Sequence, residues 1–273
     1  MTRPEPPQRP AVRVTVAQIQ GSSDPGANRE MVADAFATAQ RVRADLVVFP
    51  EYTAAFAPDG VGIEHAESLQ GPFVGRLREL AAASGVAAIA GLVIPGSDGR
   101  ASNAVVAVDG SGELAGVYRK VHLYDAFGAS ESVRLEPGPV DAPPLVLDVG
   151  GLRFGVLTCY DLRFPESARR LVDAGAQVLV VPAAWADGEL KAMHWRTLAV
   201  ARAIENTSAV VAVGMAGKRV TGRSLVVGPD GLVGLELDDE PAVRTVDIDG
   251  AQLGEVREQN PSLANRRYRV IPR

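Results

Sequence analysis

The sequence has little of several features that would point to a particular class of protein. One cysteine among 273 residues allows no disulfide within the chain. No apolar run approaches the ~20 residues that a membrane-spanning helix needs. The three histidines are scattered and have no acidic or thiol neighbours at ligand spacing. These absences argue against a disulfide-stabilised scaffold, a membrane-embedded protein and a metal site, and we expect no metal or other cofactor.

An excess of basic charge is also missing. The 28 lysines and arginines are outnumbered by 33 aspartates and glutamates, which gives a net charge of −5. Apart from Arg266 and Arg267 no basic cluster stands out, so we expect neither a nucleic acid nor a membrane as partner. The first ten residues, MTRPEPPQRP, lack the apolar segment of a signal peptide. We expect a disordered lead at residues 1–10, a single domain with a C-terminal extension at residues 11–273, and a cytoplasmic location.

Strand-like and helical runs alternate along the chain, which predicts a layered α/β fold. Glycine turns at Asp109-Gly110 and Asp230-Gly231 predict hairpins, and therefore mixed sheets. This pattern alone leaves open a doubly wound single sheet. The predicted strands cover residues 12–18, 46–49, 86–94, 103–108, 114–118, 152–158, 178–181, 209–213 and 224–227, and the predicted helices cover residues 27–44, 73–84, 165–174 and 189–205.

The single cysteine, Cys159, lies in the segment TCYDLRFPE at residues 158–166. An apolar strand precedes it and a helix is predicted from Pro165, so the thiol is placed on a strand-to-helix turn. Backbone N–H groups and a helix start favour negative charge there. A lone cysteine is commonly a small buried hydrophobe, however, so a catalytic role needs support from other residues.

Two further charged residues follow apolar strands. Glu51 lies in VVFPEY at residues 47–52, and Lys120 lies in YRKVHLYD at residues 118–125. Taken singly, a solvated carboxylate and a surface cation are the better interpretations. Taken together, a thiol, a carboxylate and an ammonium at three strand ends are the groups needed for covalent hydrolysis of an amide.

The chemistry requires these three residue types. A thiol with a pKa of about 8.5 is mostly protonated near neutral pH, so an adjacent base such as Glu51 is needed when it attacks a carbonyl carbon. The resulting oxyanion needs donors, for which the Lys120 ammonium and the Tyr160 N–H are suited. The acid formed on Glu51 can then protonate the departing nitrogen.

The segments FPEY, YRKVHLYD and CYDLRFPE, in this order, resemble the three signature segments of the nitrilase superfamily of carbon–nitrogen hydrolases. The resemblance implies a catalytic triad of Glu51 as general base, Lys120 as oxyanion stabiliser and Cys159 as nucleophile. It also implies a four-layer αββα sandwich. HWRTLAVARAIEN, GRSLVVGPDG and NPSLANRRY resemble later family segments, so the similarity extends from about residue 12 to residue 268.

The family also has a second glutamate in the pocket, and the match assigns it to Glu131, which is followed by Ser132. The alternative is a surface glutamate in a polar loop. Glu136 is a competing carboxylate that we expect to be solvated. The aromatic residues near these segments are expected to contact substrate, although such residues are as often part of the core: Tyr52, Tyr124, Tyr160 and Trp185.

The residues after Cys159 most resemble the omega-amidase and deaminated glutathione amidase branch. This implies hydrolysis of a small linear amide, aliphatic or carboxylate-bearing, to an acid and ammonia through a cysteine thioester. Two alternatives stay open: hydrolysis of an N-carbamoyl amine, and a catalytically silent binding protein with the same fold.

Family members commonly pair through helices near the nucleophile, so we expect a homodimer or a higher homo-oligomer. The helices predicted from Pro165 and from Glu189 are expected to expose the apolar residues of that interface: Leu171, Val172, Met193, Trp195 and Leu198.

Overall fold

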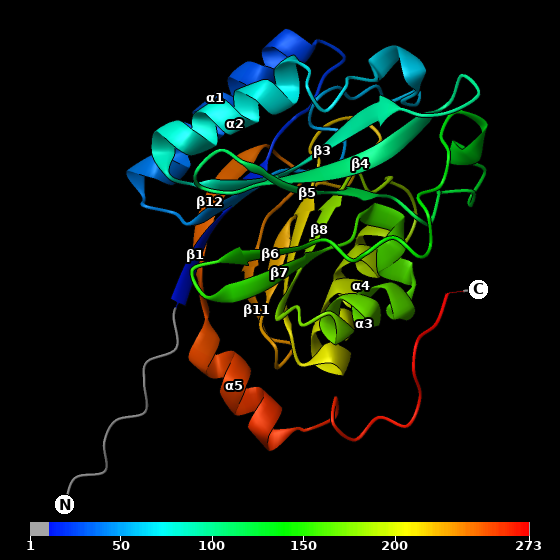
Figure 1. The fold of residues 1–273 in the computed structure, drawn as a ribbon. Helices are drawn as coiled ribbons and strands as arrows, with labels where there is room; N and C mark the ends of the chain where they lie inside the picture. The colour runs from blue at the N-terminus through cyan, green and yellow to red at the C-terminus, as the bar shows by residue number, and fades with distance from the viewer. Residues whose placement is uncertain (1–10, 273) are drawn as a thin grey trace, which may run out of the picture.

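The computed structural model describes residues 11–272, which form two six-stranded sheets packed face to face with helices on their outer faces (Figure 1). The four-layer αββα prediction is therefore confirmed, and the doubly wound alternative is wrong. The predicted disorder at residues 1–10 lies outside the described residues. Among residues 11–272, none of the helices combines the length and the apolar character needed to span a bilayer.

The first sheet is mixed, because β1, β2 and β3 are parallel while the other neighbours are antiparallel. Helices α1 (Pro25–Arg41) and α2 (Pro72–Ser84) cover its outer face (Figure 1). Asp24 begins α1 by accepting hydrogen bonds from the first-turn N–H groups. In spatial order the strands are β12 (Ala242–Asp249), β1 (Ala11–Gln18), β2 (Leu46–Val48), β3 (Ala87–Pro95), β4 (Ala101–Val108) and β5 (Leu114–Arg119).

The second sheet has the same plan, with a parallel centre of β7, β8 and β9 between antiparallel strands. Helices α3 (Pro165–Asp173) and α4 (Lys191–Asn206) pack on its outer face, and α5 (Gly250–Gln259) lies beyond the strands near β1. In spatial order the strands are β11 (Val233–Glu236), β10 (Leu225–Val227), β9 (Ala209–Gly214), β8 (Val178–Ala183), β7 (Leu152–Val156) and β6 (Val146–Val149).

Three apolar layers hold the sandwich together. In β2, Leu46 and Val48 point toward the other sheet, whereas Val47 points toward the helices, as the alternation of a strand requires. The central strands are buried on both faces, so their sequences are nearly continuous runs of Val, Ile, Leu and Ala. Each fully buried Val or Leu contributes about 1.5–3 kcal/mol relative to an exposed one.

Four elements were not predicted from the sequence: β6, β11, β12 and α5. The first two have only four residues each. The third is an edge strand, AVRTVDID, whose residues are mostly half-buried or exposed, so it lacks a strong apolar pattern. The fourth, GAQLGEVREQ, contains two glycines and few apolar residues.

The apolar residues assigned to an exposed helical face are mostly part of the core, so that prediction is wrong. Leu171, Val172 and Trp195 are buried in the layer between the second sheet and its helices, and Leu198 packs against that layer. Only Met193 is exposed. The expected homo-oligomer stays a prediction, but the buried side chains of Leu171, Val172 and Trp195 are not available for its interface.

Candidate active site

The three charged or nucleophilic residues singled out above lie together at one end of the sandwich. Glu51 follows β2, Lys120 follows β5 and Cys159 follows β7. They line a cavity of about 320 Å³. Its wall also includes Tyr52, Phe56, Tyr124, Ser130, Glu131, Arg134, Ala184 and Arg219.

Glu51 is placed by the close approach of two backbones. A Cβ atom on Gly91 of β3 would lie 2.6 Å from the Glu51 Cα and from the Tyr52 nitrogen, so only glycine allows the turn to pack there. The Glu51 side chain is 1% exposed. Its Oε1 accepts hydrogen bonds from Lys120 Nζ at 3.0 Å and from Asn103 Nδ2 at 2.6 Å, and its Oε2 accepts one from the Ala184 N–H at 2.8 Å.

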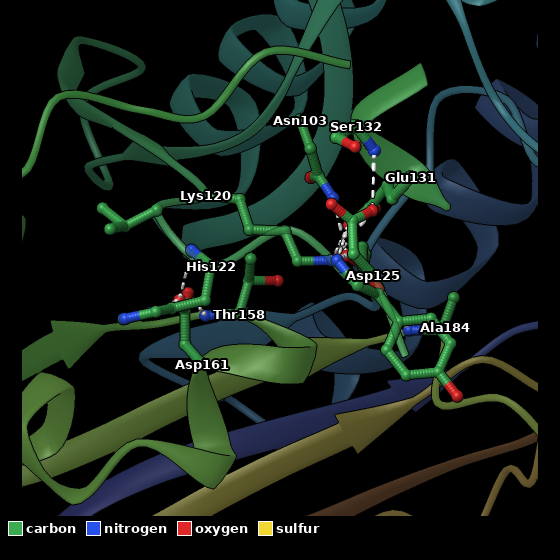
Figure 2. Close-up of polar contacts among 12 residues, drawn as sticks. Asn103, Lys120, His122, Asp125, Glu131, Ser132, Thr158, Asp161 and Ala184 are labelled. Carbon is green, nitrogen blue, oxygen red and sulfur yellow. Dashed lines mark hydrogen bonds and ion pairs between the residues drawn. The ribbon is translucent and has the colours of Figure 1, made fainter. Parts of the chain in front are cut away.

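Lys120 lies between two carboxylates. Besides its contact with Glu51, its Nζ is 3.0 and 2.9 Å from the two carboxylate oxygens of Glu131 (Figure 2). Burial by itself would lower the pKa of Lys120, but the Glu131 and Glu51 carboxylates outweigh it and hold that pKa well above its ordinary value. The ammonium therefore stays charged in the site.

Glu131 lies in the site and is mostly buried, so it is not a surface glutamate. The Tyr124 N–H donates to its Oε2 at 2.6 Å and the Tyr52 hydroxyl donates to its Oε1 at 2.5 Å. Burial alone would raise the pKa of Glu131, but Lys120 and these donors lower it below its usual value. Glu136, by contrast, accepts hydrogen bonds from two serines outside the cavity wall.

Cys159 has a strained backbone and a neutral thiol. Its φ of 48° is in the left-handed region, at the start of a 3₁₀ turn, Cys159–Arg163, that leads into α3. Burial raises the pKa of the thiol well above its ordinary value, and the Glu51 carboxylate raises it further, while Lys120 partly offsets both. The thiol is therefore protonated at neutral pH and needs a base to become a nucleophile.

A buried aspartate joins the segment around Lys120 to the turn that carries Cys159. Asp161 is 0% exposed and accepts hydrogen bonds from the Tyr118 hydroxyl at 2.7 Å and from the Thr158 N–H at 3.1 Å. Its Oδ1 is 2.7 Å from Nδ1 of His122 (Figure 2). These contacts fix the relative position of the ammonium and the thiol.

The four aromatic residues expected to contact substrate fall into two pairs. Tyr52 and Tyr124 line the cavity, whereas Tyr160 and Trp185 do not. The Tyr160 and Trp185 rings instead face the guanidinium of Arg163, with ring centroids 6.0 and 4.9 Å from its carbon. Tyr160 lies within the 3₁₀ turn Cys159–Arg163, and Trp185 follows β8 and faces Arg163 at the end of that turn, an arrangement that the spacing of the sequence does not reveal.

Three further residues of the site were missed by sequence reasoning. Asn103 contacts Glu51 from within β4, and Arg134 and Arg219 line the cavity. A polar residue within the apolar strand ASNAVVAV was a usable signal for Asn103. The two arginines follow glycine-rich or polar loops and carry no such signal. Among residues 11–272, no group of three or more His, Cys, Asp or Glu side chains could hold a metal ion.

The chain is similar in sequence to proteins of a known family. The family model described as carbon-nitrogen hydrolase matches residues 13–258. Deaminated glutathione amidase of Escherichia coli O157:H7 is 38% identical over 245 residues, which cover 88% of this chain and 92% of that protein. A hydrolase of Mycobacterium tuberculosis H37Rv is 36% identical over 272 residues, which cover 93% and 95% of the two chains.

Solved structures have a similar fold. A CN-hydrolase superfamily protein of Xanthomonas campestris, with an arsenic adduct in its active site, has a TM-score of 0.83 at 27% identity and covers 96% and 99% of the two chains. An amidase of Nesterenkonia with acrylamide added at its active-site cysteine has a TM-score of 0.77 at 31% identity and covers 91% and 97%. The chain therefore belongs to the carbon-nitrogen hydrolase family of the nitrilase superfamily, in the branch of the deaminated glutathione amidases, and is a hydrolase of carbon–nitrogen bonds other than peptide bonds.

Proposed function

We propose that this protein hydrolyses a small linear amide to a carboxylic acid and ammonia through a thioester on Cys159. The observation that carries the proposal is that the buried Cys159 side chain lines the same cavity as Glu51 and Lys120. Relatives named as amidases support the bond type. The roles of the individual residues follow from their hydrogen bonds and charges.

In the first step Cys159 Sγ attacks the carbonyl carbon of the amide, and its proton passes to Glu51. The negative charge that develops on the carbonyl oxygen is stabilised by the Lys120 ammonium and by the Tyr160 N–H. One such preorganised donor is worth about 3 kcal/mol in the transition state. Lys120 suits this role because its two carboxylate neighbours keep it charged.

In the second step the tetrahedral adduct collapses. The proton held on Glu51 moves to the amide nitrogen, the carbon–nitrogen bond breaks and ammonia leaves, so that the acyl group remains on Cys159 as a thioester. Water then attacks the thioester with Glu51 as base, the carbon–sulfur bond breaks, and the proton returns to the thiol as the acid departs. Glu131 acts as a positioning residue, because its contacts are with Lys120, Tyr52 and the Tyr124 N–H.

We expect the wild-type protein to hydrolyse an amide faster than the matching nitrile by orders of magnitude. An amide adduct needs one proton donor and one oxyanion site, whereas a nitrile gives a thioimidate that must take up water twice. The relative rates are measured as ammonia release from a panel of amides, N-carbamoyl amines and nitriles built on the same carbon chain. Mass spectrometry of the enzyme detects the thioester on Cys159. Preference for the N-carbamoyl amine or the nitrile would reject the amidase assignment, and absence of both turnover and thioester would favour the silent binding protein.

A carboxylate-bearing substrate is favoured by two arginines of the cavity wall. Arg219 pairs with Asp59 at 2.5 Å and Arg134 pairs with Glu64, and the four side chains are between 43% and 87% exposed. A guanidinium has five N–H donors and these contacts use only some of them, so each arginine keeps donors for a carboxylate of the substrate remote from the amide.

Replacing Arg219 with alanine is expected to raise KM about tenfold for a carboxylate-bearing amide, because a charge-assisted hydrogen bond worth ~1.5 kcal/mol is lost. KM for a neutral aliphatic amide should stay within about twofold. Arg196→Ala is the matched control, since Arg196 is a similarly exposed arginine that pairs with Glu236 at 3.0 Å outside the cavity. Equal changes in KM for the charged and the neutral amide would contradict the assignment.

A further inference from the structure

Asn103 is a buried amide side chain whose hydrogen bonds are directed at the general base. It lies on β4, is 1% exposed, and donates from Nδ2 to Glu51 Oε1 at 2.6 Å and to the Tyr52 hydroxyl at 2.8 Å. Figure 2 shows its side chain pointing toward Lys120 and Glu131, which form hydrogen bonds with Glu51 and Tyr52. Its Oδ1 is buried and has no hydrogen-bond partner among the described residues.

The unpaired oxygen shows which contacts determine the orientation of the side chain. Leaving a buried carbonyl oxygen without a donor destabilises the folded protein. Rotating the amide by half a turn would not help, because Oδ1 would then face the Glu51 carboxylate and both donor contacts would be lost. The hydrogen bonds from Nδ2 to Glu51 and Tyr52 therefore determine the orientation of the Asn103 side chain, although they leave its Oδ1 without a hydrogen-bond donor.

These contacts close a ring around the ammonium. Asn103 links Glu51 to Tyr52, Tyr52 donates to Glu131, and Lys120 bridges the two carboxylates. Burial, followed by the two carboxylates, raises the pKa of Tyr52, so its hydroxyl keeps the proton that it donates. The two glutamates are therefore connected in two ways: through the Lys120 ammonium, and through the neutral side chains of Asn103 and Tyr52.

The ring leaves one Glu51 oxygen with capacity to accept a proton. A carboxylate oxygen has two lone pairs. Oε1 uses both, for Lys120 and Asn103, whereas Oε2 accepts only the Ala184 N–H among the described hydrogen bonds. Oε2 therefore keeps a lone pair that can accept the thiol proton.

We propose that Asn103 is a positioning residue that occupies Oε1 of Glu51, so that proton transfer from Cys159 uses Oε2. The proposal rests on the general-base role of Glu51 in the proposed function. Without the Asn103 donor, Oε1 becomes free to take the proton in an unproductive geometry.

Asn103→Ala is expected to lower kcat about 10- to 100-fold while KM stays within about twofold. The acid limb of the pH profile should move up by about one pH unit, because a donor to the charged form is lost. The matched control is Asn206→Ala. Asn206 is equally buried, donates from Nδ2 to the Arg202 carbonyl oxygen at 2.9 Å, and also has an unpaired Oδ1, but it contacts none of the reacting groups.

The rate at which iodoacetamide alkylates Cys159 across the pH range gives a second measurement that needs no amide substrate. The same upward shift of its acid limb is expected in Asn103→Ala and not in Asn206→Ala. A shift in alkylation without turnover of any amide by the wild type would support the role of Asn103 and reject the proposed function. Should Asn103→Ala fail to fold, Asn103→Ser replaces it in both assays. Unchanged pH profiles, or an equal shift in the Asn206 variant, would overturn the proposal.

Discussion

Cys159→Ala is expected to abolish turnover, with a loss of about five orders of magnitude in kcat, while the fold is retained. Without Sγ no acyl-enzyme can form, and the remaining carboxylate and ammonium have no nucleophile to assist. The substitution removes only the Sγ atom, so it changes the packing little. Ammonia release by the purified variant, with circular dichroism to check the fold, measures the effect. Activity near that of the wild type would end the covalent mechanism.

Cys159→Gly separates chemistry from backbone strain at the same position. With φ at 48°, a residue that has a Cβ atom pays a conformational cost that glycine does not. We expect Cys159→Gly to be more stable than Cys159→Ala by about 1 kcal/mol and equally inactive. That result, from chemical unfolding of both variants, would mean that the strained backbone is kept for the placement of the thiol. A glycine variant less stable than the alanine variant would show that the site carries no such strain.

The positions of the three proposed catalytic groups could be predicted because each lies in a short local pattern. Glu51, Lys120 and Cys159 each follow an apolar strand directly, so the sequence places all three at sheet edges before any tertiary contact is known. Glu131 was the harder residue, since only the serine that follows it, as in the family's segment, distinguishes it from Glu136 in the sequence. In the structure the two glutamates differ because Lys120 binds the Glu131 carboxylate and not that of Glu136.

The remaining site residues depend on information that no local pattern holds. Asn103 reaches Glu51 only because β4 pairs with β3, whose Gly91 supports the turn that carries Glu51. The directions of Tyr160 and Trp185 depend on the 3₁₀ turn and on Arg163. A periodic apolar pattern predicts that a helix has a buried face, but it does not say what covers that face. This is why Leu171 and Trp195 were assigned to an interface although they pack on the second sheet.

Lys120→Met is expected to remove activity and to destabilise the protein by about 3–5 kcal/mol. The variant leaves two buried carboxylates without their shared cation, and an uncompensated buried charge is far more costly than a buried pair. Urea unfolding at neutral pH, together with kcat, measures both effects. The double variant Lys120→Met/Glu131→Gln should recover part of the stability but none of the activity, because one of the two charges is neutralised while the oxyanion donor is still missing.

The loss of stability in Lys120→Met is expected to depend on pH. In the wild type the pKa of Glu131 is lowered from 4.5, so its contribution to stability is present above about pH 4.5 and is lost as the pH falls through the lower folded value. Without Lys120 the Glu131 carboxylate can bind a proton at higher pH, which relieves its repulsion with Glu51. The difference in unfolding free energy between wild type and Lys120→Met should therefore be largest near neutral pH and shrink toward pH 4. A difference that stays constant or grows on acidification would mean that Lys120 stabilises the site by packing of its aliphatic chain and not by its charge.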